Sequence, residues 1–575
     1  MSLPRLLFDF ENAEGTKEEL EFSNPLEVIT AHTVEEVEPA FKEAEKKLEK
    51  GFYLAGYVSY EAAPAFDKVY KVNSLFKWPL VWFGVFRKPE VYHRTKSPEP
   101  YKVSHWSMEG NFESYQTGIQ QIKDAIESGD TYQVNYTTRL SAEFSGDALS
   151  FYRQLAANQR AGYSAYLNIG GERKILSASP ELFFRKAGET LQTKPMKGTS
   201  KRGRTLEEDE KQKCFLRKST KEQAENLMIV DLLRNDLGRI AVPGSIHVPR
   251  LFDVETYPTV HQMTSTVEAK VEENTAMWDI FSALFPCGSI TGAPKIRTMD
   301  YIADLEQSPR EVYCGAIGYI TPEKDAVFNV PIRTVMLTGS RAVYGTGGGI
   351  TWDSTPLGEY EELQTKAKLL TEKRPDFKLL ESMRLEDGEF PMFSYHLNRL
   401  KNSSIYFNYC LNEKLLNQKI EELKRCYTHG TYKVRLLVSE HGEVEAEAAE
   451  IVEDINEMKG CLADQPVDKA NPFLYHKTTY RDVYDVHQKD GAGLILLWNK
   501  EGQLTEFTIG NFVVKHKGKL LTPPVESGLL RGTFRESLVE KGIIEEHTLY
   551  KKDLSSFEEI WMINGVRGWV RVDLL

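Results

Sequence analysis

The sequence predicts an α+β protein with two successive domains, residues 1–372 and residues 376–575. Strand-like runs at 53–60 and 80–86 open the chain, and a helical stretch rich in Glu and Lys lies at 34–50. Strands and helices continue to mix through the first domain. This mixture of short strands and amphipathic helices is what indicates the α+β class.

A polar segment at 371–376 marks the expected domain boundary. It ends a helix, and Pro375 disfavours helix in the residue before it. After it, strands and helices restart. Strands are expected at 495–498, 512–515 and 519–521, where apolar runs are separated by turn residues.

The composition is that of a soluble chain with packed cores, since 41% of the residues are hydrophobic and 27% are charged. A formal net charge of −12 disfavours binding to nucleic acid or to an anionic membrane. The one basic cluster, at 194–204, is short. The sequence has no apolar run of about 18 residues, so no membrane span is expected. Asp9 and Glu11 come too early for a signal peptide.

The cysteines favour a cytoplasmic location. They are scattered, and no two of them form a CxxC pair. This pattern argues against zinc ribbons and disulfide frameworks, and it suits a reducing compartment.

Two acidic clusters are candidates for a metal site. Glu222 and Glu225 share a helix face at a spacing of three, and Glu359, Glu362 and Lys366 share another. Each cluster alone is typical of a solvated acidic face. If the fold brought the two together they would repel, and a hard cation such as Mg²⁺ would relieve the repulsion.

A glycine-rich loop is expected at 344–350, where backbone N–H groups can approach an anion closely. It lacks the Lys-Ser/Thr of a nucleotide-binding P-loop. The alternative is a plain glycine turn between strands. Arg333, just before it, can grip a carboxylate with its guanidinium fork, or it is an ordinary surface charge.

Several longer motifs stand in order along the first domain. They are SASPELF at 177–183, KPMKGT at 194–199, MIVDLLRNDLG at 228–238, GSITGAPK at 288–295, GAIGY at 315–319 and the glycines at 345–350. Together they resemble the chorismate-utilising enzyme family, which includes anthranilate, aminodeoxychorismate, isochorismate and salicylate synthases. The resemblance runs from about residue 50 to 370 with family-like spacing, and it implies an α/β sandwich domain. The segment 51–66 also looks like the aminodeoxychorismate synthase branch.

The resemblance assigns roles to named residues. Glu225 and Glu362 match direct Mg²⁺ ligands, supported by Glu222 and Glu359. His261 matches a histidine near the reacting ring, with a structural histidine as the alternative. The positions that match holders of the substrate carboxylates are Tyr313, Arg333, Gly347, Gly349 and Lys366.

Lys197 selects the branch of the family. Anthranilate synthases carry Ala at this position, whereas aminodeoxychorismate synthases carry Lys. A neutral lysine amine can attack C2 of chorismate as the 4-hydroxyl leaves, after which ammonia attacks C4 and releases the lysine. Glu181 matches the family's general acid, which protonates the departing hydroxyl. The alternatives are an anthranilate synthase-like domain or a surface lysine.

The part of the chain that resembles this family contains no domain that would produce ammonia. The sequence has no cysteine nucleophile motif with the His and Glu of a glutaminase downstream, so a separate glutamine amidotransferase subunit or free ammonia must supply it.

Four segments of the second domain resemble the fold-type IV pyridoxal-phosphate family. They lie at 395–400, 475–481, 504–512 and 530–535. The family contains aminodeoxychorismate lyase, branched-chain aminotransferase and D-amino acid aminotransferase. The resemblance implies a fold-type IV α/β domain and, since such enzymes are often dimers, it suggests a homodimer.

By this resemblance Lys477 is the Schiff-base lysine and Glu506 is the partner of the ring nitrogen. Positions matching phosphate binders are Arg399, Ile509, Gly510, Gly532 and Thr533. One departure is Phe534, which stands where the family usually has Thr.

The fusion of the two domains suggests the overall reaction. If the first domain makes 4-amino-4-deoxychorismate, a neighbouring lyase would convert it to 4-aminobenzoate and pyruvate, a step of folate biosynthesis. One alternative is an aminotransferase acting on branched-chain or D-amino acids. Another is a cofactor-free module that docks a glutaminase.

Overall fold

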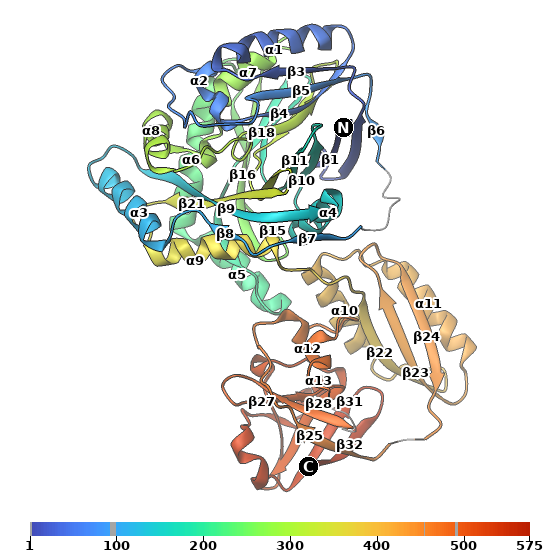
Figure 1. Ribbon diagram of the computed structural model, residues 1–575. Helices are drawn as coiled ribbons and strands as arrows, with labels where there is room; N and C mark the ends of the chain where they lie inside the picture. The colour runs from blue at the N-terminus through green and yellow to red at the C-terminus, as the bar shows by residue number, and fades with distance from the viewer. Residues whose placement is uncertain (1–2, 93–98, 454, 489–492, 575) are drawn as a thin grey trace. The chain divides into compact units, whose positions relative to one another are not determined.

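The computed structural model describes residues 3–92, 99–453, 455–488 and 493–574 (Figure 1). The chain divides into two compact units. Unit 1 comprises Met1–Lys201 and Lys213–Arg374, and unit 2 comprises Arg202–Gln212 and Pro375–Leu575. The expected domain limits at 372 and 376 remain predictions, and the short stretch 202–212 is grouped with unit 2. Both units combine sheets with helices, which confirms the α+β class.

Unit 1 contains two antiparallel sheets. In the described part of the chain the first runs β17 (Gly292–Ala293), β9 (Gln133–Gly146), β21 (Arg341–Ile350), β20 (Thr334–Thr338), β11 (Arg173–Ser179), β10 (Tyr163–Asn168), β1 (Arg5–Glu11), β2 (Lys17–Ser23) and β6 (Glu90–Val91). The second runs β14 (Met196–Lys201), β16 (Val260–Lys270), β13 (Thr190–Lys194), β12 (Leu182–Ala187), β19 (Ala326–Asn329), β18 (Ala316–Ile320), β4 (Tyr53–Val58), β5 (Val81–Phe86) and β3 (Glu27–Ala31). Short strands β7 (Tyr101–Val103) and β8 (Ser107–Met108) pair with β9, and β15 (His247–Thr256) pairs with β16.

The two sheets pack face to face as a sandwich. Phe8 and Phe10 of β1 share one apolar cluster with Tyr57 of β4 and Tyr319 of β18. Because side chains alternate along a strand, the remaining faces are free to receive helices. The predicted strands at 53–60 and 80–86 are confirmed as β4 and β5.

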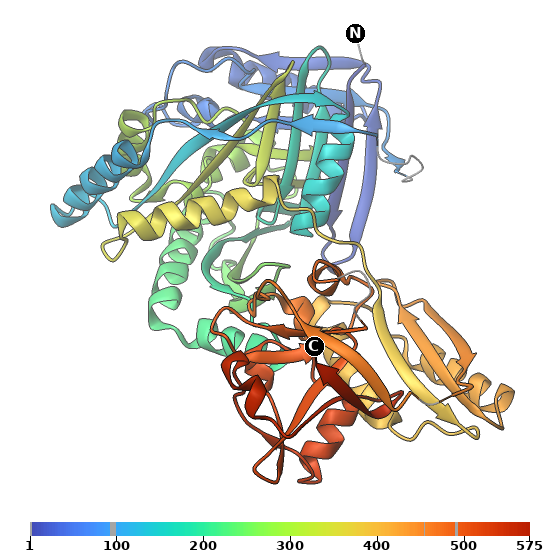
Figure 2. The same ribbon diagram turned by 60° about the horizontal axis from the view of Figure 1, so that its bottom comes forward.

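Helices cover the outer faces of the sandwich (Figure 1). The predicted helix at 34–50 is α1 (Val34–Glu49), which begins with a capping box between Thr33 and Glu36 and buries Phe41 against α7 (Met277–Leu284). The other helices of unit 1 are α2 (Ala63–Phe66), α3 (Phe112–Glu127), α4 (Ala148–Gln159), α6 (Thr220–Gly238), α8 (Lys295–Leu305) and α9 (Pro356–Ala367), while α5 (Leu206–Lys218) begins in the stretch grouped with unit 2. Helices α3 and α9 lie side by side in both views (Figures 1 and 2), with the rings of Phe112 and Tyr360 5.1 Å apart.

Unit 2 contains a small sheet and a larger one. The small sheet is β22 (Leu379–Glu386), β23 (Thr431–Val438) and β24 (Val444–Glu450), covered by α10 (Phe393–Phe407) and α11 (Glu413–Cys426). The larger runs β27 (Leu504–Phe507), β26 (Leu494–Trp498), β25 (Glu457–Leu462), β32 (Gly568–Leu574), β31 (Glu559–Asn564), β28 (Gly510–His516), β29 (Lys519–Thr522) and β30 (Glu545–Glu546). Since β27 also pairs with β28, six of these strands close into a ring. The strands expected at 495–498, 512–515 and 519–521 are confirmed, and α12 (Asp482–Asp485) and α13 (Thr533–Glu540) complete the unit.

The stretch 202–212 is held within unit 2 by buried polar contacts. Arg202 donates to the carbonyl oxygen of Tyr406 at 2.7 Å, and a paired hydrogen bond to Asp209 of the same stretch fixes its guanidinium. Arg204 donates to the hydroxyl of Tyr475 at 2.8 Å, and its carbonyl lies 3.2 Å from Nε2 of His476. These contacts explain why a stretch that the sequence places in the first domain groups with the second unit. None of the described helices in either unit combines the length and apolar character that a membrane-crossing helix requires.

Candidate active site

A cavity of about 400 Å³ in unit 1 gathers most of the side chains that the motifs single out. Its wall is formed by β9, β14, β21, α6 and α9 together with the turns that follow β11 and precede β20. The predicted residues that line it are Glu181, Lys197, Glu222, Glu225, Tyr313, Arg333, Gly347, Gly349, Glu359, Glu362 and Lys366.

His261 does not line this cavity. Its side chain is fully buried on β16, and its Nδ1 lies 3.2 Å from the hydroxyl of Thr256 on the neighbouring strand. Its neighbours Val260 and Gln262 reach the wall instead. This location suits the structural interpretation of His261, and its proposed place near the reacting ring stays a prediction.

Lys197 and Glu181 are neighbouring titratable groups in the cavity. Burial raises the pKa of Glu181 to about 7, against the lowering effects of a hydrogen bond with Ser289 and the charge of Lys197. Burial also lowers the pKa of Lys197, which Glu181 and Glu225 oppose. Both shifts run toward the uncharged forms, a protonated carboxyl group and a neutral amine, which are the forms that a general acid and a nucleophile require.

The two acidic clusters meet in this cavity. Burial and mutual repulsion raise the pKa values of Glu222 and Glu225 on α6 and of Glu359 on α9. The charge of Glu362 raises the pKa of both carboxyl groups on α6, so α6 and α9 face each other. The pKa of Glu362 itself is lowered, because Lys366, whose Nζ lies 2.7 Å away, outweighs the effect of partial burial.

The carboxylates suit a cation that also binds water and substrate oxygens, rather than one enclosed by protein ligands alone. No group of three or more His, Cys, Asp or Glu among the described residues is arranged to hold a metal ion by itself. The cavity instead offers hard oxygen donors on two sides, with net repulsion between them. Mg²⁺ commonly binds through one or two carboxylates plus water and substrate oxygens, so these donors fit that ion.

The glycine-rich segment is a strand, so the prediction of a loop at 344–350 is wrong. Residues up to Ile350 pair with β9 as the end of β21, and none of these glycines has a positive φ. Glycine is needed at these positions because neighbouring atoms lie too close to the backbone to leave room for a Cβ. A Cβ at Gly347 would lie 2.3 Å from the carbonyl oxygen of Tyr136, and one at Gly349 would lie 2.0 Å from Nε2 of Gln133. In the described ladder β20 pairs with β21 only as far as Tyr344, which leaves backbone of β21 beyond it to form the cavity wall.

A buried arginine supports the cavity from behind. Arg310 is 1% exposed and donates to the carbonyl oxygens of Ile290 and Asn135, each at 2.8 Å. Both of these residues line the cavity. Glu306 balances the charge of Arg310 at 2.7 Å, so this part of the wall is fixed by a buried ion pair.

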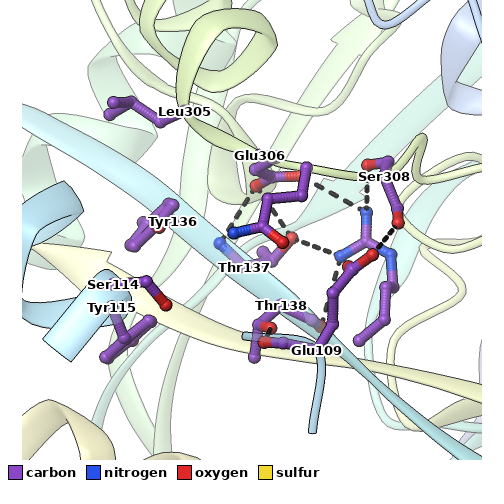
Figure 3. Close-up of a pocket in the computed structure, with 11 residues that line it drawn as sticks. Glu109, Ser114, Tyr115, Tyr136, Thr137, Thr138, Leu305, Glu306 and Ser308 are labelled. Carbon is purple, nitrogen blue, oxygen red and sulfur yellow. Dashed lines mark hydrogen bonds and ion pairs between the residues drawn. The ribbon is translucent and has the colours of Figure 1, made fainter. Parts of the chain in front are cut away.

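A second arginine holds Tyr313 in place. Figure 3 shows Glu306, Thr137 and Ser308 lining a second, smaller pocket of unit 1. The guanidinium of Arg139 donates to Thr137 at 2.8 Å and to Glu306 at 3.3 Å. The same guanidinium lies 5.3 Å from the ring centroid of Tyr313, within cation–π range. The ring of Tyr313, predicted to contact substrate, therefore rests on a fixed charge.

Three further wall residues were not singled out from the sequence. Ser289 lies within the GSITGAPK motif and contacts Glu181, so the motif carried a signal for it. Thr346 lies within the glycine-rich motif at 344–350, whereas Gln133 had no signal beyond its place on a strand. Gln133 Oε1, Glu181 Oε1 and Thr346 Oγ1 are all buried without a hydrogen-bond partner, which is unusual unless a polar ligand supplies one.

In unit 2, Lys477 and Glu506 form the corresponding pair. Burial lowers the pKa of Lys477 to about 8, helped by the charge of Arg399. Burial raises the pKa of Glu506 to about 8, and this carboxyl group accepts hydrogen bonds from Tyr484 Oη at 2.9 Å and from the backbone N–H of Leu530 at 3.1 Å. A lysine with a depressed pKa near a fixed carboxyl group suits attachment of an aldehyde cofactor.

The predicted phosphate binders lie around a buried carboxylate. Glu381 accepts from Arg399 at 2.9 and 2.5 Å and pairs with His396 at 2.7 Å. His396 Nε2 in turn lies 3.3 Å from the hydroxyl of Thr533. Gly532 is the N-cap of α13, and a Cβ there would lie 1.9 Å from Oδ1 of Asn511, which explains the glycine.

The other positions predicted to bind phosphate or to depart from the family pattern are Ile509, Gly510 and Phe534. Ile509 and Gly510 stand at the turn into β28, where Asn564 donates to the carbonyl oxygen of Ile509 at 3.1 Å. Phe534, the departure from the family pattern, lines a separate cavity of about 340 Å³ together with His396. Lys477 and Glu506 therefore have the chemistry that a phosphorylated pyridine cofactor requires, whereas Arg399 is already paired with Glu381 and its role as a phosphate binder stays a prediction.

Comparison with known proteins finds a family model for each of the two parts of the chain. The family model described as chorismate binding enzyme matches residues 5–372, and the model described as amino-transferase class IV matches residues 378–575. A probable aminodeoxychorismate synthase of Oryza sativa is 45% identical over 267 residues, which are 46% of this chain and 30% of that protein. Aminodeoxychorismate synthase component 1 of Escherichia coli K12 is 43% identical over 260 residues, which are 45% of this chain and 57% of that protein.

Among solved structures, anthranilate synthase component I from Streptococcus pneumoniae is 25% identical with a TM-score of 0.51. The similarity covers 64% of this chain and 92% of that one. The curated relatives above are matched over less than two thirds of their own length, so the likeness concerns the shared domain.

Proposed function

This chain belongs to the chorismate binding enzyme family, and we propose that unit 1 converts chorismate and ammonia to 4-amino-4-deoxychorismate. The observation that carries the proposal is Lys197, which lies in the family's cavity beside Glu181. The curated relatives named aminodeoxychorismate synthase support the choice of product.

The proposed reaction divides between the two side chains. The lone pair of Lys197 Nζ forms a bond to C2 of chorismate, the ring double bonds shift, and the C4–O bond breaks. Glu181 gives its proton to the departing hydroxyl, which leaves as water, and the carboxylate then recovers a proton from the new secondary amine. Ammonia attacks C4, the ring double bonds shift back, and the bond from C2 to Lys197 breaks. Glu181 gives a proton to the departing nitrogen, so that Lys197 leaves as a neutral amine, and recovers one from the ammonium group at C4.

The carboxylates of chorismate require positive groups, and the wall supplies them. Arg333 and Lys366 are the cations suited to this task, with Tyr313 and backbone of Gly347 and Gly349 beside them. Mg²⁺ would be held by Glu225 and Glu362, supported by Glu222 and Glu359, and would neutralise charge on a bound carboxylate.

For unit 2 we propose a pyridoxal-phosphate lyase that releases pyruvate and forms 4-aminobenzoate, completing a step toward folate. When bound, the cofactor would supply an electron sink for this elimination. Lys477 would hold the cofactor and, once displaced by the substrate amine, move the proton. Glu506 would pair with the ring nitrogen, and Arg399, Thr533 and the turn at 509–510 would bind phosphate.

The proposal includes a partner and a compartment. The relatives named component 1 support a separate glutamine amidotransferase that supplies ammonia. All six cysteines are free thiols in the structure, which suits the reducing cytoplasm that we propose. We also propose a homodimer, by analogy with fold-type IV enzymes.

Product identification tests the proposal. The intact chain is incubated with chorismate, ammonia, Mg²⁺ and pyridoxal phosphate, and the products are separated by chromatography. We expect 4-aminobenzoate and pyruvate. Anthranilate or salicylate would contradict C4 amination by Lys197.

A second function for unit 2 is favoured by its match to the class IV amino-transferase model. In that case 4-amino-4-deoxychorismate would accumulate, and the chain would transfer amino groups from branched-chain or D-amino acids to a 2-oxo acid. Without any binding of pyridoxal phosphate, a docking module for the glutaminase would be the remaining interpretation.

The acid role of Glu181 predicts a pH dependence. Its pKa is about 7, and only the protonated form can donate, so kcat/KM for chorismate should fall as pH rises through about 7. The assay should hold the concentration of neutral NH3 constant at each pH, so that the nucleophile does not vary. An amination rate that stays constant well above pH 7 would contradict the assignment.

The metal proposal predicts the effect of Glu362→Gln. Loss of one carboxylate should raise the Mg²⁺ concentration for half-maximal chorismate turnover by about 10–100-fold. Binding of Mg²⁺ is measured separately by calorimetry. Glu361→Gln, on the exposed side of the same helix, is the matched control. Unchanged Mg²⁺ dependence in Glu362→Gln would exclude Glu362 as a ligand.

A further inference from the structure

Gln133 is a buried glutamine whose side chain faces Lys197. It begins β9, is 1% exposed, and lines the cavity of unit 1. A Cβ added to Gly349 would lie 2.0 Å from Nε2 of Gln133 and 3.1 Å from Nζ of Lys197. The carboxamide and the amine therefore both lie on the side of Gly349 where its Cβ would be, as close neighbours.

The carboxamide has an unused acceptor. Its Oε1 is buried without a hydrogen-bond partner, and leaving such an atom unpaired costs about 1–3 kcal/mol. The two ends of a carboxamide exchange by rotation about the last side-chain torsion, so either end can face the amine. A neutral amine has two N–H donors and one lone pair. If an acceptor oxygen binds one of the N–H groups, it limits the directions in which the lone pair can point.

We propose that Gln133 is a positioning residue for Lys197: its carboxamide oxygen accepts an N–H of the neutral amine and directs the lone pair into the cavity. The inference rests on the proposed amination of chorismate. It adds a residue that no motif of the chain assigns. The oxygen keeps this hydrogen bond while Nζ forms its bond to C2, so the amine does not rotate away from the ring.

An amide suits this place better than a carboxylate. The charged groups that already face Lys197 are Glu181, Glu225, Glu362 and Lys366. One more carboxylate would stabilise the ammonium form, which has no lone pair, whereas an amide accepts the hydrogen bond without adding charge. The choice of glutamine therefore keeps the nucleophile neutral at lower pH.

Two variants separate orientation from charge. Gln133→Leu keeps the approximate volume but removes the acceptor, and it should slow attack by Lys197 by about 10²-fold at all pH values. Gln133→Glu should move the acid side of the pH profile of kcat/KM to higher pH. The matched control is Gln192→Leu on β13, a partly buried glutamine of the same unit that bonds Glu268 and does not line the cavity.

The experiment measures both the covalent adduct of chorismate with Lys197 and the formation of 4-amino-4-deoxychorismate. The full chain is mixed with chorismate and Mg²⁺ without ammonia, and the chorismate-derived mass on Lys197 is followed by mass spectrometry. Thermal unfolding and the conversion of 4-amino-4-deoxychorismate in unit 2 show that each variant is folded. Wild-type adduct rate in Gln133→Leu, or an unmoved pH profile in Gln133→Glu, overturns this inference alone. If the unaltered chain forms neither adduct nor 4-amino-4-deoxychorismate, the proposed function falls with it.

Discussion

Lys197→Ala is expected to abolish formation of 4-amino-4-deoxychorismate, with a loss of about 10³-fold or more in kcat, which corresponds to at least about 4 kcal/mol of transition-state stabilisation. The alanine cannot form the bond to C2, so no intermediate exists for ammonia to attack at C4. Glu181 remains able to protonate the 4-hydroxyl. Residual turnover should therefore be direct attack at C2, and chromatography of the products will detect it.

The control for this variant is Lys201→Ala. Lys201 ends the same strand but is exposed, so its loss removes one charge without touching the cavity. It should retain wild-type rate and product. Conversion of 4-amino-4-deoxychorismate by unit 2 of the Lys197→Ala chain should also be unchanged. Wild-type amination at C4 in Lys197→Ala would show that nitrogen reaches C4 without a covalent lysine step.

Much of this site could be predicted because its signals are local. Lys197 and Glu181 stand in short motifs, and the spacing of Glu222 and Glu225 fixes one helix face. That the acidic faces of α6 and α9 meet could not be predicted from spacing, because it depends on pairing of strands far apart in the sequence, and only the family resemblance indicated it. The sandwich of unit 1 supplies that step.

One error, one difference in grouping and one omission have physical causes. The segment at 344–350 looked like a loop because glycine usually marks turns, yet here each glycine admits a close neighbour within β21. The stretch 202–212 follows unit 1 in sequence, but Arg202 and Arg204 find their partners in unit 2. Gln133 was missed because an isolated glutamine on a strand has no pattern, and only its position beside Lys197 indicates a role.

Lys477→Ala is expected to stop the chain at 4-amino-4-deoxychorismate. The variant lacks the amine that would hold the cofactor and move the proton, so formation of 4-aminobenzoate and pyruvate should fall by about 10³-fold or more. Burial lowers the pKa of Lys477 to about 8, so a substantial neutral fraction is available in the wild-type chain near that pH. Consumption of chorismate by unit 1 should continue at the wild-type rate, which makes the accumulated intermediate directly measurable.

Attachment of the cofactor gives a second readout for Lys477→Ala that is independent of activity. Treatment with pyridoxal phosphate and borohydride, followed by peptide mass spectrometry, should label the peptide of Lys477 in the wild-type chain and leave it unlabelled in the variant. Lys459→Ala, an exposed lysine on β25, is the matched control and should label normally at Lys477. Unchanged output of 4-aminobenzoate in Lys477→Ala would refute the lyase assignment of this lysine.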